Sequence, residues 1–306
     1  MKRIRIATRR SELALAQSGW FARELERELR VATELVPLET SGDRIAGSLA
    51  AVGGKGLFVK EIQEALLSGH ADLAVHSAKD LPAQTPAALR IAAVPRREDP
   101  RDALVAREPG MSLAALPRGA RIGTGSVRRS AQLLRYRSDL TIVPLRGNVP
   151  TRLRKLESEA LDAVVLACAG LARLSLEAHI RERISEAVVL PAVGQGALAI
   201  EARRGEALAE DLAALDDAAT AIELAAERGF QARLGGDCAV PIAAHARLEG
   251  GRLVLTGLVI TPDGSRVAAG QLSGSEQGAR ALGQTLAEQV LGAGGREILA
   301  VSRGTR

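Results

Sequence analysis

R-I-G-T-G-S-V-R-R-S, residues 121–130, joins a short strand-like run to a turn of small residues and the start of a helix. The pattern predicts a strand over residues 121–123 and a helix from Ser126. It recurs at residues 141–143 and at Pro150, whose missing N–H is harmless in the first helical turn. Strand and helix patterns alternate in this way through the first two thirds of the chain. This alternation predicts βαβ units with ligand-binding loops at the carboxyl ends of the strands.

The flanking sequence divides the chain into three parts. Residues 96–101 and 190–197 are interpreted as two crossings between α/β lobes, after which residues 198–201 return a strand to the first lobe. From about Asp217, helix patterns enclose three strand patterns, with a hairpin turn at residues 262–264. The predicted fold class is therefore α/β, with two doubly wound lobes and a smaller C-terminal α+β domain. The predicted boundaries are residues 1–96 with 195–215 for lobe 1, 97–194 for lobe 2 and 216–306 for the α+β domain.

Arginine is concentrated at the predicted turns of the second lobe. Residues 121–155 hold eight arginines and one lysine against a single acid, Asp139. Four of these arginines fall in expected first turns of helices, where positive charge opposes the helix dipole by ~0.3–1 kcal/mol per charge. A bound anion would explain them, because guanidinium groups and free N–H groups at a helix start both bind carboxylate or phosphate. The cluster, which consists of Arg128, Arg129, Arg152 and Arg154, predicts a site for a small polyanion.

Composition narrows the possible partners. The 306 residues are 46% hydrophobic and 25% charged, as in an ordinary globular protein. The net charge of +5 favours acidic partners, but the 2% of aromatic residues leaves few platforms for stacking bases, so nucleic-acid binding is not expected. No apolar run reaches the ~18 residues of a membrane span. Charges such as Glu12 and Glu24 interrupt any signal-peptide pattern, and a cytoplasmic location without membrane contact is expected.

An acid follows a predicted strand at residues 71–75. The segment V-H-S-A-K-D-L-P, residues 75–82, places Asp80 in a loop together with Lys79 and Ser77. A lone aspartate before Leu-Pro often caps a turn. At the carboxyl end of a parallel strand, however, its carboxylate would face the cleft between the lobes, where it could accept an N–H group or stabilise a developing cation.

The two cysteines differ in their surroundings. Cys168 lies inside the apolar run V-V-L-A-C-A-G-L and is expected to be a small buried hydrophobe. Cys238 lies in the glycine-rich segment G-G-D-C-A-V-P-I, residues 235–242, which makes it a candidate for a covalent role. A cysteine–histidine hydrolase stays open, although no spacing places a histidine beside Cys238. The scattered histidines give no metal-binding pattern, and the small-residue segment 40–56 predicts a mobile cover over a site.

Taken in order, these segments resemble one family, the porphobilinogen deaminases or hydroxymethylbilane synthases. The resemblance covers nearly the whole chain. Each motif alone is weak, but the ordered set is specific. It includes I-A-T-R-R-S-E-L-A-L-A-Q (6–17), V-G-G-K-G-L-F-V-K-E (52–61), D-L-A-V-H-S-A-K-D-L-P (72–82), R-E-D-P-R-D-A (97–103), G-T-G-S-V-R-R (123–129), L-R-G-N-V-P-T-R-L-R-K-L (145–156), L-P-A-V-G-Q-G-A-L (190–198) and G-G-D-C-A-V-P-I (235–242).

The resemblance implies an activity and a cofactor. The family joins four porphobilinogen units head to tail, with loss of ammonia, to give hydroxymethylbilane for tetrapyrrole biosynthesis. It implies a dipyrromethane cofactor attached through a thioether to Cys238, with Asp80 as the catalytic carboxylate. It also implies lobes similar to type II periplasmic-binding-protein domains, and a cytoplasmic monomer.

The resemblance further implies which residues hold the anionic groups. Those expected at the cofactor are Cys238, Lys79, Ser77, Thr124, Ser126, Arg128, Arg129, Arg146, Lys55 and Asp80. Those expected at the substrate are Arg9, Ser11, Arg146, Asn148, Arg152, Arg173 and Gln195.

Some positions depart from the family pattern. Gly125 stands where a second serine is common, Ala51 where a lysine often precedes the glycines, and Asp237 beside the cysteine where glycine is frequent. None of these changes removes a group that the chemistry needs. A different class remains open as an alternative: a non-catalytic, two-lobed protein that binds small carboxylates, which would carry no covalent adduct on Cys238.

Overall fold

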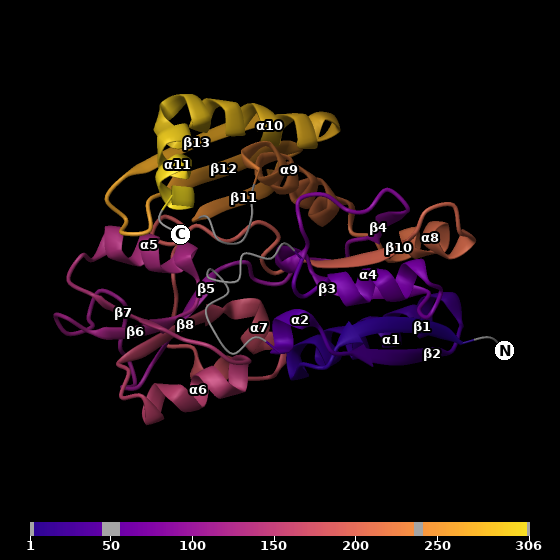
Figure 1. Cartoon of the computed structure of the whole chain (residues 1–306), viewed down its shortest axis with the longest axis horizontal. Coiled ribbons are helices and arrows are strands. Elements are labelled where there is room, and N and C mark those ends of the chain that lie inside the picture. The colour runs from indigo at the N-terminus through magenta and orange to yellow at the C-terminus, as the bar shows by residue number, and fades with distance from the viewer. Residues whose placement is uncertain (1–2, 45–55, 236–240, 305–306) are drawn as a thin grey trace.

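The computed structural model describes residues 3–44, 56–235 and 241–304, which form three sheets with their helices (Figure 1). Sheet A has the strand order β2-β1-β3-β10-β4. Strand β1 pairs in parallel with β2 and β3, whereas β10 is antiparallel to both β3 and β4. Its strands are β1 (Ile4–Arg9), β2 (Thr33–Leu38), β3 (Leu73–Ser77), β4 (Leu89–Ala93) and β10 (Leu198–Arg203).

Helices cover both faces of sheet A. Helix α1 (Glu12–Leu29) buries Phe21 against the face that contains Ile6, and α4 (Lys60–Leu67) packs against the face that contains Ala7. Successive residues of β1 thus enter two different hydrophobic clusters, as the two-residue period of a strand requires. The short elements of this part are α2 (Ser41–Arg44), η1 (Ala78–Asp80), α8 (Ala207–Asp211) and η3 (Leu212–Leu215).

Sheet B repeats this arrangement with the order β7-β6-β8-β5-β9. Strand β6 is parallel to β7 and β8, and β5 is antiparallel to β8 and β9. Leu104 and Val105, adjacent in β5, again belong to separate hydrophobic clusters. The elements are β5 (Asp102–Ala106), β6 (Arg121–Thr124), α5 (Val127–Tyr136), β7 (Thr141–Pro144), α6 (Val149–Ser158), β8 (Ala163–Ala167), α7 (Cys168–Arg173), η2 (Glu177–His179) and β9 (Glu182–Arg183).

The C-terminal part is an antiparallel sheet, β11-β12-β13, packed against helices. Phe230 of α9 is fully buried in its core. Gly229 and Gly283 let α9 and α10 touch, since a Cβ on either would collide with the backbone of the other helix. The elements are α9 (Ala218–Leu234), β11 (Ile242–Glu249), β12 (Arg252–Ile260), β13 (Val267–Gly274), η4 (Glu276–Gly278), α10 (Ala279–Val290), η5 (Leu291–Gly295) and α11 (Arg296–Gly304).

The chain passes twice between sheets A and B. It leaves sheet A after β4 to begin sheet B at β5, and it returns from β9 to sheet A at β10. The two connecting segments lie side by side, because the N–H of Glu98 donates to the carbonyl of Gly196 at 3.2 Å. The predicted fold class is confirmed: two mixed α/β sheets and a smaller α+β unit. The predicted domain boundaries stay a prediction.

Candidate active site

Asp80 and Arg9 meet at the carboxyl ends of two parallel strands. Asp80 ends η1, directly after β3, and Arg9 ends β1. The carboxylate Oδ2 of Asp80 lies 3.7 Å from Nη1 of Arg9, and its side chain is 32% exposed. Arg9 is held in turn by Asp43 and by the ring of Phe58, whose centroid lies 4.1 Å from the guanidinium carbon. Asp80 is therefore positioned by a cation and open to solvent on another side.

Lys79 points toward the opposite connecting segment. Its Nζ lies 3.4 Å from Oε1 of Gln195. Burial lowers the pKa of Lys79 to about 8, and the charge of Arg129 contributes to this, while Asp80 and Asp102 oppose it. An anionic partner would stabilise the charged form of such a lysine.

A buried carboxylate, Asp102, organises the arginines at the start of α5. Asp102 is 0% exposed and begins β5. It accepts from Nη2 of Arg128 at 2.7 Å, from Nη2 of Arg129 at 2.7 Å and from Nε2 of Gln195 at 2.9 Å. The two guanidinium groups hold the pKa of Asp102 well below its usual range although burial acts in the other direction. Sequence reasoning did not select Asp102, since its charge partners lie 26 and 27 residues away.

The Asp102 pairing gives Arg128 and Arg129 a partner within the protein. From the sequence alone, a bound anion is the expected reason for their position at a helix start. Two cations still share one carboxylate, and the remaining donors of these arginines reach the carbonyls of Leu190 and Val165 at 2.6 and 3.1 Å. The cluster therefore keeps one positive charge in excess, which an anion would offset.

Helix α6 adds further cationic groups. Asn148 caps this helix by accepting from the N–H of Thr151 at 2.9 Å, and Nε of Arg152 donates to the carbonyl of Gly147 at 2.8 Å. Burial lowers the pKa of Arg152 to about 10, with Arg129 and Arg146 acting in the same direction and Asp80 opposing them. Arg152 is therefore within electrostatic range of Arg129 on α5 and of Asp80 beside sheet A. Residues predicted from separate motifs converge here.

Arg173, at the end of α7, lies near the second connecting segment. Its Nη2 donates to the carbonyl of Gly196 at 2.7 Å, and burial lowers its pKa to about 10. Together with Ser77 and Lys79 it lines a small cavity of about 20 Å³. Ser77 already exchanges hydrogen bonds with Gln17, at 3.0 Å from Nε2 of that side chain.

The predicted hydroxyl ligands have local partners. Ser126 caps α5 by accepting from the N–H of Arg129 at 3.4 Å, and Oγ1 of Thr124 accepts from the N–H of Ser126 at 3.2 Å. Ser11 caps α1 by accepting from the N–H of Ala14 at 3.3 Å. Capping fixes where these hydroxyls lie. It does not test their predicted contact with a ligand.

Three residues named from the sequence, Lys55, Ala51 and Cys238, lie outside the described residues, as does Asp237. The described chain reaches Gly235 at the end of α9 and resumes at Pro241. Cys168 is confirmed as a buried hydrophobe: it is 2% exposed, and burial raises the pKa of its thiol to about 12. Within residues 3–44, 56–235 and 241–304 no group of three or more His, Cys, Asp and Glu side chains could hold a metal ion.

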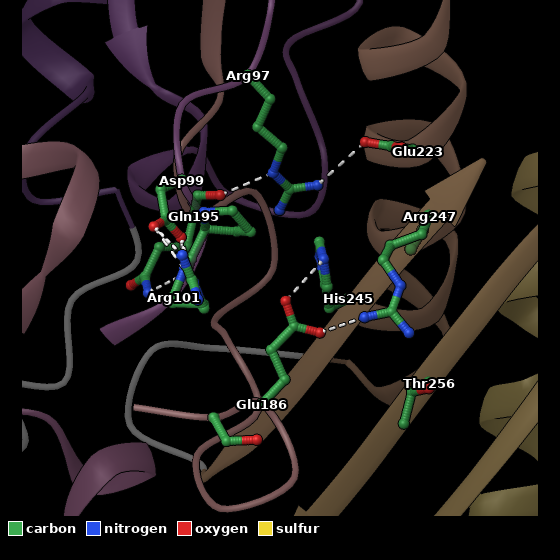
Figure 2. A network of polar contacts seen from close by, with 12 residues as sticks. Arg97, Asp99, Arg101, Glu186, Gln195, Glu223, His245, Arg247 and Thr256 are labelled. Carbon is green, nitrogen blue, oxygen red and sulfur yellow. Dashed lines mark hydrogen bonds and ion pairs between the residues drawn. The ribbon is translucent and has the colours of Figure 1, made fainter. Parts of the chain in front are cut away.

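A second buried carboxylate joins the connecting segments to the C-terminal unit. Glu227 of α9 is 0% exposed and accepts from Nη1 of Arg97 at 2.7 Å and from the backbone N–H of Gly194 at 2.6 Å. His245 on β11 lies 3.2 Å from Glu227. Glu186 lies 3.4 Å from the other ring nitrogen of His245 and also pairs with Arg247 at 2.7 Å (Figure 2). The network therefore joins the two connecting segments, through Arg97 and Gly194, to the C-terminal unit. Through Glu186, which follows β9, it also reaches the unit built on sheet B.

The geometry defines a class of protein. Two α/β units connected twice bring buried and half-buried cationic side chains near an accessible carboxylate, Asp80, an arrangement that suits a small polyanion next to an acid. Among the described residues no helix is long and apolar enough to cross a membrane.

The comparisons with known proteins identify the family. Residues 4–211 match the model "Porphobilinogen deaminase, dipyromethane cofactor binding domain", and residues 221–292 match "Porphobilinogen deaminase, C-terminal domain". The porphobilinogen deaminase of Syntrophotalea carbinolica is 52% identical over 300 residues, covering 97% of this chain and 95% of the relative. That of Geobacter metallireducens is 49% identical over 302 residues, covering 98% and 94%. The chain belongs to the porphobilinogen deaminase family, transferases of tetrapyrrole biosynthesis with a dipyrromethane cofactor.

Solved structures with a partial likeness include the periplasmic aliphatic sulphonate binding protein of Escherichia coli. It is 15% identical, with a TM-score of 0.41, over 76% of this chain and 70% of that protein.

Proposed function

We propose that this chain condenses porphobilinogen at the site between sheets A and B, with Asp80 as the catalytic carboxylate. The observation that carries the proposal is the position of Asp80. It lies 3.7 Å from Arg9 and within electrostatic range of Arg152, beside a cluster with excess positive charge. A pyrrole with two carboxylates needs cations for its side chains and an acid at its reacting end. The four condensations each form one C–C bond and release one ammonia.

The residues around Asp102 suit the cofactor. The carboxylate side chains of dipyrromethane require several cations. Lys79, Arg128 and Arg129 are partly or fully withdrawn from water. Arg128 and Arg129 share one acid, Asp102. We assign Lys79, Ser77, Thr124, Ser126, Arg128, Arg129 and Arg146 to holding it, with Lys55 and the thioether of Cys238 from outside the described residues. When bound, dipyrromethane supplies the primer on which the pyrrole chain grows.

We assign the substrate carboxylates to three other arginines, which lie on three different elements: Arg9 on β1, Arg152 on α6 and Arg173 on α7. Ser11, Asn148 and Gln195 complete the predicted set, and we assign Arg146 to both groups. Gln195 contributes by position: its Nε2 donates to Asp102 at 2.9 Å while its Oε1 lies 3.4 Å from Nζ of Lys79. It therefore links the arginine cluster to the lysine beside Asp80.

Asp80 would act through charge and proton transfer. An ionised carboxylate stabilises positive charge that develops on the pyrrole as the amine departs, and it accepts or returns a proton at the pyrrole nitrogen. Arg9 keeps the carboxylate oriented, and Asp43 keeps Arg9 in place, since its carboxylate accepts from the Arg9 guanidinium.

The test replaces Asp80 by asparagine. Asp80→Asn should fold and bind the substrate but lose turnover by roughly 10²–10³, the usual cost of removing a preorganised charge. Asp72→Asn, directly before β3 and paired with Arg5 and Arg203 instead, is the matched control and should keep its turnover. Near-normal turnover in Asp80→Asn would remove Asp80 from the mechanism. Intact-protein mass spectrometry should show a dipyrromethane adduct on the wild-type chain, and its absence would favour a non-catalytic anion-binding protein.

The proposal includes a cytoplasmic monomer that binds neither nucleic acid nor membrane. It rests on the family resemblance. Sedimentation of the purified protein tests the oligomeric state, and fractionation of cells tests the location.

A further inference from the structure

A second, larger cleft lies between the edge strand β4 of sheet A and helices α9 and α10. Its volume is about 620 Å³, against about 20 Å³ for the cavity beside Lys79. None of the residues assigned above to cofactor or substrate lines it. The size is that of a pocket for a small organic molecule.

Four arginines from four separate segments line this cleft, which we call the arginine cleft. They are Arg90 of β4, Arg204 after β10, Arg228 of α9 and Arg280 of α10. Asp216 is the one acid in the described lining, and its carboxylate already accepts from the N–H of Val94 at 2.6 Å. Arg90 also pairs with Glu210, at 2.8 Å, outside the lining. Positive charge is therefore in clear excess within the cleft.

Two of these arginines have buried donors without an acceptor among the described residues. Nη2 of Arg228 donates to the carbonyl of Pro82 at 3.0 Å, but its Nη1 is buried and unpaired. Nη2 of Arg90 donates to the carbonyl of Ala209 at 2.6 Å, but its Nε is buried and unpaired. A buried donor without an acceptor is unfavourable, and more so when it is charged. Ligand oxygen atoms would remove that cost.

Charge and burial act together on Arg228. Burial lowers its pKa, the nearby charge of Arg280 lowers it further, and Glu201 opposes both. Planar guanidinium groups bind carboxylate or phosphate with two parallel hydrogen bonds. Four such groups around one cleft match a ligand with more than one anionic group.

We propose that the arginine cleft binds a small molecule carrying two or more carboxylate or phosphate groups, as a regulatory site separate from the active site. Arg228 connects the cleft to the catalytic machinery, because its guanidinium holds the carbonyl of Pro82, two residues after Asp80. Helix α9, which carries Arg228, ends four residues before Cys238. An anion bound to Arg228 would therefore affect the segment that carries Asp80 and the helix that leads to Cys238.

The experiment measures anion binding to the cofactor-loaded enzyme, so that the cofactor already fills the cations assigned to it and only the substrate arginines of the active site stay open to a probe. Citrate and pyrophosphate are the probes, titrated by calorimetry, and they separate carboxylate from phosphate chemistry. The test variant is Arg204→Glu/Arg280→Glu, since both side chains are exposed and reversal leaves the core intact. We expect the affinity for the better probe to fall at least about tenfold, a modest loss for two reversed charges.

The control is Arg118→Glu/Arg252→Glu, with the same change in net charge at two exposed positions outside the cleft lining. It should bind the probe like the wild type. Both double variants should keep the wild-type turnover without probe, and the probe should change turnover in the wild type and control only. Equal loss of binding in both variants would show general charge attraction and overturn the proposal. So would the absence of binding by either probe at millimolar concentration, or inhibition that is purely competitive with porphobilinogen and unchanged in the test variant.

Discussion

Asp102 and Glu227 are both fully buried carboxylates, yet the charges around them are balanced differently. Asp102 is shared by two arginines and a glutamine amide. Glu227 receives one arginine, the ring of His245 and two backbone N–H groups, those of Gly194 and Ala246. The first cluster retains excess positive charge beside Asp80, whereas the second pairs its carboxylate with one permanent cation.

We propose that this difference separates a cluster that binds a ligand from one that is purely structural. A buried ion pair with satisfied hydrogen bonds has no need of a further group. A buried carboxylate with two guanidinium partners leaves a charge that water does not solvate, so an anionic ligand is favoured there. Density of arginine alone does not distinguish the two.

The largest expected effect breaks the structural cluster. Glu227→Gln leaves Arg97 buried without its carboxylate, and removing one partner of a buried pair typically costs about 3–5 kcal/mol. The loss should be the same with and without the cofactor. Chemical denaturation of both forms measures it. The lowered pKa of Glu227, about 2, also predicts that its contribution is present above pH 4.5 and is lost as the pH falls toward 2.

The next prediction concerns the other carboxylate. Asp102→Asn leaves Arg128 and Arg129 without their shared acid and should destabilise the cofactor-free protein by about 3 kcal/mol. In the loaded protein the loss should be smaller, because cofactor carboxylates supply counter-charge. Denaturation of the two forms gives the comparison. An equal loss in both forms would show that the Asp102 cluster is structural, like that of Glu227.

A smaller effect depends on pH. The pKa of Lys79 is lowered to about 8 in the anion-free protein, so the ammonium needed to hold an anion is lost above that pH. Affinity for a pyrrole carboxylate should fall by up to about tenfold per pH unit above 8. Because the folded pKa lies below the unfolded 10.5, stability of the anion-free protein should instead rise between pH 8 and 10.5. Lys79→Gln should remove both slopes, and a wild-type affinity that stays flat from pH 7 to 10 would contradict the prediction.

The smallest effect separates helix capping from ligand binding. Ser126→Ala and Ser11→Ala each remove a cap and should each cost about 1 kcal/mol of unfolding free energy. Ser126→Ala should in addition weaken retention of the cofactor, whereas Ser11→Ala should instead raise the KM for porphobilinogen. Denaturation, adduct mass and steady-state kinetics provide the three readouts. If each variant differed from the wild type in stability alone, both serines would be helix caps without a role in ligand binding.

Much of this arrangement could be predicted from local pattern. The strand before Asp80 and the helix starts at Ser126 and Asn148 have clear periodicity and capping residues, so the sequence located them to within a few residues. β3 covers Leu73–Ser77, whereas the sequence pattern predicts residues 71–75, a shift within the usual difference between definitions of strand ends. The hairpin at residues 262–264 is confirmed, with Gly264 at φ 76°.

The charge partners could not be predicted in the same way. Asp102 meets its arginines across 26 and 27 residues, and Glu227 meets Arg97 across 130. Such pairs depend on how sheets and helices pack, and no local pattern encodes that. The two-residue strand β9 and the short helix α7 were also not predicted, since neither is long enough to show a period.

The position of β10 within sheet A has a consequence for biosynthesis. This strand lies between β3 and β4, although about a hundred residues of lobe 2 separate it from β4 in the chain. As the polypeptide leaves the ribosome, β4 has no partner in its own sheet until residues 198–203 emerge. Lobe 2 can therefore complete its sheet before sheet A does. Until then β3 has an unpaired edge, and chaperones that bind exposed strand edges would act at this stage.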